Sequence, residues 1–240
     1  MEINAESPRD IPSAYSLYYS RLADTFVRLS KPLHPRTILE AGCGKGQLTL
    51  PLIKRLPTKI RLIGVDSSKG PYSGWLEELA FKVETRRLAN RIRLVKADVR
   101  NLERIRDASI DLIVSNELVC DLVKEHQLRR AFQEFYRVLK PGGKMIHGEW
   151  SSSPKTRPQH FGITHWPNWN PDQLFSQLER LNFHHIGATY FETTIKFGYW
   201  AALEELRTWG ASETTIRKSH STIEKKGIHL PFEHIIECRK

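Results

Sequence analysis

The chain has 240 residues, of which 40% are hydrophobic, a composition that suits a globular domain with insertions. No run of eighteen apolar residues and no apolar leader occurs, so we expect neither a membrane-spanning helix nor a secretory signal. Cys43, Cys120 and Cys238 lie far apart with no CxxC pair. This argues against a disulfide framework or a zinc ribbon and favours a reducing, cytoplasmic location.

The charge balance is basic, with 37 Lys and Arg against 27 Asp and Glu and a net charge of +10. A basic chain suits an anionic partner such as RNA. The positive residues occur in small clusters, however, such as Arg86-Arg87. Dispersed clusters of this kind favour an ordinary solvated surface over a dedicated nucleic-acid face.

A leading segment, residues 1–36, contains a predicted helix from about residue 13 to residue 33. Its aromatic residues recur at helical spacing and are Tyr15, Tyr18, Tyr19 and Phe26. Such a face can cover a binding site or simply pack against the rest of the domain, and the pattern does not separate these alternatives.

From residue 37 to residue 150, short apolar runs alternate with helix-like stretches, which predicts βαβ units and a mainly parallel sheet. The predicted strands are Thr37–Ala41, Arg61–Val65, Ile92–Lys96, Ile110–Ser115 and Lys144–Glu149. The predicted helices are Gln47–Leu56, Tyr72–Leu88 and Glu125–Leu139.

The remaining residues depart from this alternation. Residues 151–170 show no periodicity and contain His160, His165, Trp166 and Trp169, which favours an aromatic lid over a metal-binding loop because no carboxylate or thiol accompanies the histidines. After them we expect a helix at 171–181, a strand at 184–192, two helices at Tyr199–Trp209 and Glu213–Lys226, and a final strand, Phe232–Cys238.

The glycines of "LEAGCGKG" follow the first predicted strand, at the end where open parallel sheets bind ligands. Gly42, Gly44 and Gly46 have the spacing GxGxG, which differs from both the dinucleotide GxGxxG pattern and the Walker GxxxxGK[ST] pattern. Glycines this dense indicate either a tight turn or the close approach of a ligand.

The motif E-x-G-x-G-x-G resembles motif I of the class I S-adenosylmethionine-dependent methyltransferases. Four further stretches, "LIGVDSS", "RLVKADVRNL", "IDLIVSNELVCD" and "FYRVLKPGGKMIHGEW", resemble later parts of the same family in the same order. The resemblance is strong from residue 37 to residue 150. It implies an α/β fold with a doubly wound, mainly parallel seven-stranded sheet of the Rossmann-like methyltransferase type, whose last strand is antiparallel.

The resemblance also implies S-adenosylmethionine as cofactor. It places Asp66 on the ribose hydroxyls, Asp98 near the adenine amino group with Val99 beside the ring, and Glu40 near the methionyl ammonium. Two hydroxyls and an ammonium are donors, and carboxylates at strand ends accept charge-assisted hydrogen bonds from them. The full set of expected cofactor-binding residues is Glu40, Gly42, Gly44, Gly46, Asp66, Ser67, Asp98, Val99 and Asn116.

For the acceptor side, the resemblance points to the ends of the fourth and fifth strands. The candidates for catalytic roles are Glu117, Glu149 and His147, although a buried strand histidine is more often a core residue than a base. The turn lacks the Asn/Asp-Pro-Pro-Tyr/Phe motif, which argues against methylation of adenine N6 or glutamine. No metal site is expected.

We therefore expect a leading segment, 1–36, and a methyltransferase domain, 37–240, with a helical insertion at 199–226 before the last strand. The expected function is S-adenosylmethionine-dependent methylation of a small-molecule acceptor. One alternative is methylation of RNA or of a translation protein, and a second is S-adenosylmethionine binding without transfer. We expect no membrane partner, and the sequence does not predict the oligomeric state.

Overall fold

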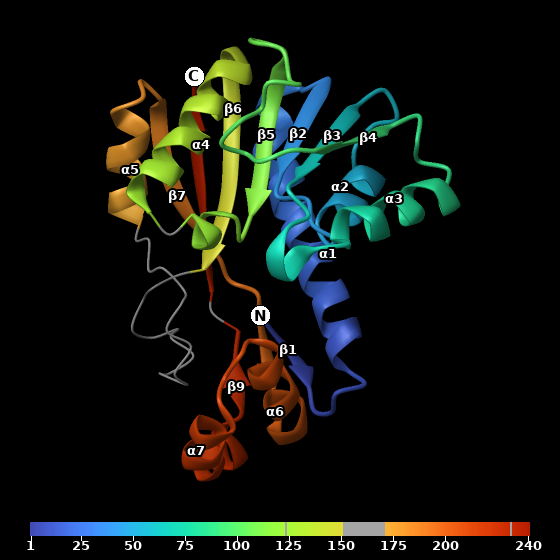
Figure 1. The fold of residues 1–240 in the computed structure, drawn as a ribbon, viewed down its shortest axis with the longest axis vertical. Coiled ribbons are helices and arrows are strands. Elements are labelled where there is room, and N and C mark those ends of the chain that lie inside the picture. The colour runs from blue at the N-terminus through green and yellow to red at the C-terminus, as the bar shows by residue number, and fades with distance from the viewer. Residues whose placement is uncertain (123, 151–170, 231) are drawn as a thin grey trace.

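The computed structural model describes residues 1–122, 124–150, 171–230 and 232–240, and of residue 32 only the backbone. Within these residues the chain forms a seven-stranded sheet flanked by helices and a smaller unit built around a three-stranded sheet. The large sheet occupies the upper part of Figure 1 and the smaller unit lies below it, at the end toward which the tips of β5 and β6 point. The fold prediction of a Rossmann-like methyltransferase sheet is confirmed.

The large sheet has the strand order β4-β3-β2-β5-β6-β10-β7. All neighbours pair in parallel except β10, which runs antiparallel to both β6 and β7. The strands are β2 (Thr37–Ala41), β3 (Arg61–Asp66), β4 (Ile92–Lys96), β5 (Ile110–Asn116), β6 (Leu139–Trp150), β7 (His184–Phe191) and β10 (Glu233–Arg239). The seven strands expected from the sequence are therefore present, and the last is antiparallel.

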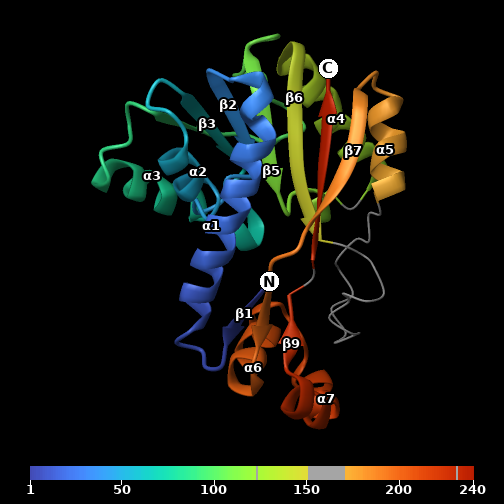
Figure 2. The same ribbon diagram turned by 180° about the vertical axis from the view of Figure 1, so that it is seen from behind.

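Helices cover both faces of this sheet because its strands are apolar on both sides. Ile38 belongs to the core on one face and its neighbour Leu39 to the core on the other, as the two-residue period of a strand requires. Figures 1 and 2 show the two helical layers from opposite sides. One layer contains α1 (Ile11–Ser30), α2 (Thr49–Arg55) and α3 (Trp75–Thr85), and the other contains α4 (Glu125–Val138) and α5 (Pro171–Glu179).

The ends of several elements differ from the sequence prediction. Helix α3 begins at Trp75 rather than at Tyr72, because Gly70–Tyr72 form a short 3-10 turn and Gly74 adopts φ 86°. Strand β6 begins at Leu139 rather than at Lys144, because Leu139 already pairs with Ile110 of β5. Helix α4 (Glu125–Val138) ends one residue before the predicted Leu139, and the pairing of β6 with β5 is irregular between Leu139 and Lys144.

The smaller unit joins the amino terminus to the insertion before the last strand. Its three strands are β1 (Glu2–Ala5), β8 (Thr194–Phe197) and β9 (Ile228–His229), and β1 pairs in parallel with β8. Two helices, α6 (Tyr199–Thr208) and α7 (Glu213–Lys226), complete it. The sequence predicted both helices but none of these strands, since each is only two to four residues long.

Helix α1 connects the two parts. Tyr18, Leu22 and Phe26 are fully buried, and they belong to one continuous core with Phe197 of β8 and Ile146 of β6. Figure 2 shows the helix running from the smaller unit upward along the large sheet. The aromatic face of α1 therefore packs against both units.

Within the described ranges no helix is long and apolar enough to cross a bilayer.

Candidate functional site

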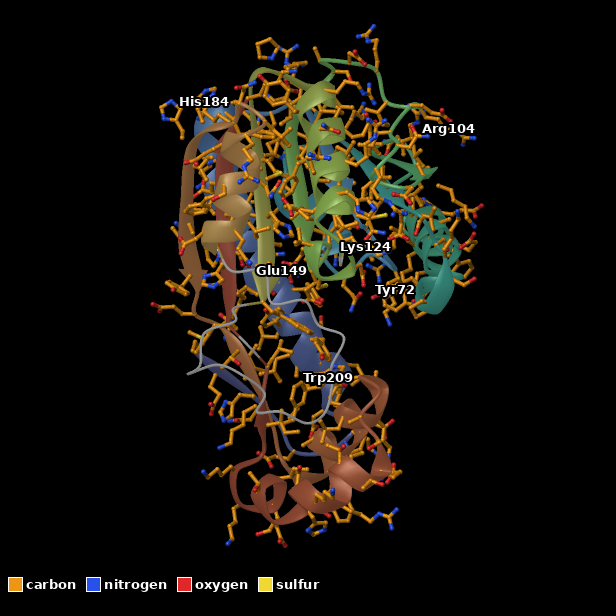
Figure 3. All side chains as sticks on the ribbon, turned by 60° about the vertical axis from the view of Figure 1, so that its left-hand side comes forward. Tyr72, Arg104, Lys124, Glu149, His184 and Trp209 are labelled. Carbon is orange, nitrogen blue, oxygen red and sulfur yellow. The ribbon has the colours of Figure 1, made fainter. Side chains whose placement is uncertain are left out.

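The candidate site lies at the carboxyl ends of the parallel strands, facing the smaller unit. In Figure 3, Glu149, Lys124 and Tyr72 lie at this edge of the large sheet, whereas Arg104 and His184 lie at the opposite edge. Polar side chains from the ends of β2, β3, β5 and β6 meet here because parallel strands end together. The antiparallel strand β10 begins at the same edge, so its first residue, Glu233, also lies there.

The glycine loop between β2 and α2 has positive φ at all three predicted glycines. The angles are 75° at Gly42, 48° at Gly44 and 88° at Gly46. The Cβ atom of any other residue at Gly42 would lie 3.1 Å from Leu118 Cδ1, and one at Gly44 would lie 3.1 Å from Trp75 Cε3. Glycine is thus required here both by backbone conformation and by close packing against these two side chains.

Asp66, the last residue of β3, holds this loop in place. Its Oδ2 accepts a hydrogen bond from the Gly44 amide at 2.9 Å, and its Oδ1 accepts one from the Ser68 amide at 2.7 Å. A carboxylate has about four lone-pair positions, so both oxygens keep the capacity to accept a ribose hydroxyl. Ser67, also predicted, lies between these two contacts and is partly exposed.

Glu40, at the end of β2, is 2% exposed, and its Oε2 has no hydrogen-bond partner among the described residues. Burial raises the pKa of Glu40 to about 8, and the negative charge of Asp66 adds to the shift. A buried acceptor oxygen without a partner is costly. The methionyl ammonium of S-adenosylmethionine is a cationic donor and fits this oxygen, so the residues present suit the cofactor.

The predicted adenine contacts lie beyond β4. Asp98 is held by Arg100, whose Nε donates to Asp98 Oδ1 at 2.8 Å, and this hydrogen bond lowers the pKa of the Asp98 carboxyl. Val99 is buried in the same apolar cluster that Leu118 packs against. The apolar side chains of an adenine site are therefore adjacent, while the carboxylate of Asp98 already has an arginine partner.

The predicted acceptor-side residues come together at the ends of β5 and β6. Asn116 Nδ2 donates to Glu117 Oε1 at 3.2 Å, and Glu117 itself adopts φ 49°. Glu149 accepts hydrogen bonds from the Cys120 and Trp150 amides, both at 3.1 Å. Turn geometry directly after β5 thus places Glu117 beside the end of β6.

His147 is 1% exposed and lies behind these groups. Its Nδ1 is 2.8 Å from Ser115 Oγ, and its Nε2 is 3.4 Å from Glu149 Oε2. The ring is therefore enclosed by its own sheet, which is the arrangement expected of a core histidine.

Two contributions to the site were missed from the sequence. Glu233 is fully buried, and the Tyr18 hydroxyl donates to its Oε1. Tyr72 donates to Asp121 Oδ1 at 2.9 Å, which links the segment after β3 to the end of β5. One signal in the sequence could have identified Glu233. It is a carboxylate at the start of the final apolar strand, which lies at this edge of the sheet once that strand is known to be antiparallel.

The carboxyl groups at this edge influence one another. Burial raises the pKa of Glu233 to about 8, and the charge of Glu149 adds to the shift. Burial also raises the pKa of Glu117 well above its usual range, with further contributions from the charges of Glu233 and Glu149. These carboxyl groups therefore hold protons at a pH at which surface glutamates are ionised.

No group of three or more His, Cys, Asp or Glu side chains in the described ranges is arranged to hold a metal ion. His160, His165, Trp166 and Trp169, the residues of the predicted aromatic lid, lie outside the described residues. Their place relative to the site stays a prediction.

Comparison with known proteins identifies the core of this arrangement. Residues 38–143 match the model of a methyltransferase domain. The chain is 32% identical over 153 residues to the malonyl-[acyl-carrier protein] O-methyltransferase of Priestia megaterium, a match that covers 60% of this chain and 50% of the relative. It is 31% identical over 116 residues to the ubiquinone/menaquinone biosynthesis C-methyltransferase UbiE of Geotalea daltonii, covering 48% and 46%. The chain spans about half the length of these curated relatives.

Solved structures share the fold over nearly the whole chain. The YcgJ protein from Bacillus superimposes with a TM-score of 0.69 at 13% identity, covering 93% of this chain and 98% of that one. The [4+2]-cyclase SpnF superimposes with a TM-score of 0.66 at 20% identity, covering 92% and 80%. Identities this low establish the architecture alone.

The domain match begins on β2 and includes the glycine loop, Asp66 and the end of β5, which are the parts that the resemblance in sequence identified. The fold, the strand order and the buried carboxyl group of Glu40 agree with that match. Residues 38–143 therefore form a methyltransferase domain, as the resemblance to the class I S-adenosylmethionine-dependent methyltransferases predicted.

Proposed function

We propose that this protein transfers the methyl group of S-adenosylmethionine to a small-molecule acceptor. When bound, S-adenosylmethionine supplies a methyl group activated by a positively charged sulfur. The observation that carries the proposal is the unpartnered, buried carboxyl oxygen of Glu40 beside a glycine loop that Asp66 holds in position. The relatives named above, a malonyl-[acyl-carrier protein] O-methyltransferase and a ubiquinone/menaquinone biosynthesis C-methyltransferase, support an acceptor of this class.

In this proposal the residues of β2, β3 and β4 hold the cofactor. Glu40 accepts from its ammonium, Asp66 accepts from its ribose hydroxyls, and Val99 with Leu118 gives apolar contact to its base. These residues orient the cofactor rather than taking part in covalent chemistry, because alignment of the reacting atoms supplies much of the acceleration in an in-line displacement.

Elements outside the matched domain contribute to the acceptor side. Helix α1 reaches the site through Tyr19, which donates to Glu117 Oε1 at 3.3 Å, and contacts the insertion through Tyr15, which donates to Glu205 Oε2 of α6 at 2.7 Å. We therefore keep the division into a leading segment, 1–36, and a domain, 37–240, with its insertion at 199–226, as part of this proposal. A cytoplasmic setting also belongs to it and is supported by the free thiols of all three cysteines.

Two alternatives predict different acceptors. An RNA methyltransferase would present a continuous basic surface beside the cofactor. Lys124 is exposed at this edge of the sheet, but the buried charged side chains of the described residues are glutamates, with no lysine or arginine among them. The second alternative is a protein that binds the cofactor without transferring its methyl group. The same architecture occurs in a [4+2]-cyclase, so the fold alone does not establish methyl transfer.

The test is transfer of labelled methyl from S-adenosylmethionine into fractionated cell extract, with products sorted into small-molecule, RNA and protein pools. We expect label in the small-molecule pool. Label confined to RNA or protein would support the first alternative, and tight cofactor binding without label in any pool would support the second.

A matched pair of glycine variants tests the cofactor site itself. Gly44 and Gly142 both have positive φ, at 48° and 73°, but Gly142 lies at the opposite edge of the sheet with no atom within 4 Å of an added Cβ. Alanine should cost each position about 1–2 kcal/mol of folding stability through backbone strain. Only Gly44→Ala should also weaken cofactor binding measured by calorimetry. If both folded variants bind the cofactor with unchanged affinity, the glycine loop is only a tight turn and does not contact the cofactor.

A further inference from the structure

Three glutamates gather at the acceptor end of the site, each from a different strand end. Glu117 follows β5, Glu149 lies near the end of β6, and Glu233 begins β10; we refer to them as the glutamate cluster. Glu149 is 4% exposed and Glu233 is fully buried. Glu117 is partly buried. Burying carboxyl groups together is unfavourable unless cations or hydrogen bonds compensate for the lost water.

The cluster is next to the cofactor site. Leu118, whose side chain packs against Gly42 of the glycine loop, directly follows Glu117 in the chain. Asn116, at the end of β5, joins two members of the cluster, because its Nδ2 donates to Glu117 Oε1 at 3.2 Å and lies 3.5 Å from Glu233 Oε1. A group bound at the cluster would therefore lie beside a cofactor held by the glycine loop.

Two buried oxygen atoms at the cluster have no hydrogen-bond partner within the described part of the chain. They are Asn116 Oδ1 and Glu233 Oε2. Both face the backbone of Gly148, since a Cβ built there would lie 2.2 Å from the first and 2.6 Å from the second. Two acceptor oxygens thus converge on one place without a donor, and leaving such atoms unpaired costs about 1–3 kcal/mol each.

The described donors to this cluster are hydroxyl groups and backbone amides, and one histidine lies beside it. Tyr18 and Tyr19 donate to Glu233 and Glu117, backbone amides donate to Glu149, and His147 Nε2 lies 3.4 Å from Glu149 Oε2. None of the buried side chains among the described residues is a lysine or an arginine. A ligand can bring the donor that the two oxygens lack, and a positively charged ligand favours the ionised form of the carboxyl groups.

We propose that the glutamate cluster binds the methyl acceptor and that the acceptor is a primary or secondary amine, which enters as an ammonium ion. This inference rests on the proposed function. An ammonium brings several N–H donors and a positive charge to three carboxyl groups and an amide oxygen, and the hydroxyl groups of Tyr18 and Tyr19 contact two of these carboxyl groups. Acceptors that carry a carboxylate or phosphate at the reacting end are disfavoured by repulsion from the cluster.

The reaction balances with the groups present. Binding of the ammonium favours the ionised form of Glu233, whose pKa is about 8 in the free protein, and the ionised carboxylate then takes one proton from the ammonium and exposes the nitrogen lone pair. That lone pair forms the N–CH3 bond as the C–S bond breaks, and the bonding electrons leave on sulfur to give a neutral thioether. The methylated nitrogen is then itself an ammonium and departs as such, and the proton on the glutamate passes to solvent.

The experiment uses S-adenosylmethionine with a deuterated methyl group and the small-molecule fraction of a cell extract. Products that carry the label are identified by mass, separated by ion exchange at pH 7 and treated with base. We expect a labelled product that a cation exchanger retains and that base leaves intact, as a methylated amine behaves. A labelled product that is neutral, anionic or cleaved by base to methanol would overturn the amine inference while the proposed function stood. No labelled product in any pool would overturn the proposed function as well.

Variants of the cluster then test the residues. With the amine found in this way, Glu233→Gln and Glu117→Gln should each raise its KM about tenfold to a hundredfold, the loss expected when a charged hydrogen bond is removed. Glu179→Gln, an exposed change on α5, is the matched control and should leave KM unchanged. Cofactor affinity measured by calorimetry confirms that each variant is folded. If KM is unchanged in both cluster variants, the glutamate cluster does not bind the acceptor.

Discussion

In the proposed cofactor site, Glu40 is the residue whose protonation should link cofactor binding to pH. Its pKa of about 8 means that the free protein holds a proton on this carboxyl group at neutral pH. A bound ammonium favours the ionised form, so binding lowers the pKa and releases a proton. Between pH 6 and pH 7, below the pKa of the cofactor's own amino group, affinity should rise with pH by up to about tenfold per unit.

Calorimetry in buffers of different ionisation enthalpy measures this release directly. We expect close to one proton per cofactor for the native protein at pH 6.5 and none for Glu40→Gln. Equal proton release by both proteins would show that another group titrates and that Glu40 does not face the ammonium.

Helix α1 is the element that joins the site to the smaller unit. Three of its tyrosines donate to glutamates on three different segments: Tyr15 to Glu205 of α6, Tyr18 to Glu233 of β10, and Tyr19 to Glu117 after β5. The aromatic face of α1 therefore packs against the sheet and also positions carboxyl groups of the site.

Replacing each tyrosine by phenylalanine measures these contacts with little change in shape. Tyr18→Phe should lower the free energy of unfolding most, by about 1–3 kcal/mol, because it strips a fully buried glutamate of its strongest donor. Tyr19→Phe should cost least, since its hydrogen bond is long at 3.3 Å. Denaturant unfolding gives the three values, and a Tyr18→Phe cost no larger than that of Tyr19→Phe would contradict the order.

The whole molecule separates its charges. The net charge is +10, yet the buried charged side chains of the described residues are glutamates, among them Glu40, Glu149 and Glu233. Positive charge therefore lies on the surface, where it aids solubility and attracts anions in general, while the interior at the site is acidic. Basic composition thus says little about the acceptor, because the lysines and arginines lie outside the interior and the charged side chains buried at the site are glutamates.

This separation predicts that stability falls as the pH rises through neutrality. Glu40 and Glu233 have folded-state pKa values of about 8 against an ordinary value of 4.5, so their contribution is fully present below pH 4.5 and lost as the pH rises through 8. The melting temperature should be lower by about 5 °C or more at pH 8.5 than at pH 5.5.

The double variant Glu40→Gln/Glu233→Gln keeps the shape of both side chains and cannot ionise at either position. Most of the difference in melting temperature between the two pH values should disappear in it. A native protein that melts at the same temperature at both pH values would contradict the raised pKa values.

Much of the fold could be predicted from local pattern. The alternation of apolar runs and amphipathic stretches identified all seven strands of the large sheet, because each strand buries both faces and each helix buries one. The glycine loop could also be predicted, since three glycines within five residues after a strand indicate positive φ whatever surrounds them. The short strands β1, β8 and β9 could not be predicted, because they exist only through pairing between the two ends of the chain.

The sequence by itself therefore determined the methyltransferase domain, its S-adenosylmethionine cofactor and the strand ends at which we propose that the cofactor binds, since these depend on residues close together in the chain. Only the tertiary structure decided the composition of the acceptor site. Tyr18, Glu117 and Glu233 are separated by about a hundred residues from one to the next, and no local pattern links them. They meet because β10 runs antiparallel to β6, which brings its first residue to the edge where the parallel strands end, and because α1 crosses that edge on its way from the smaller unit to the sheet.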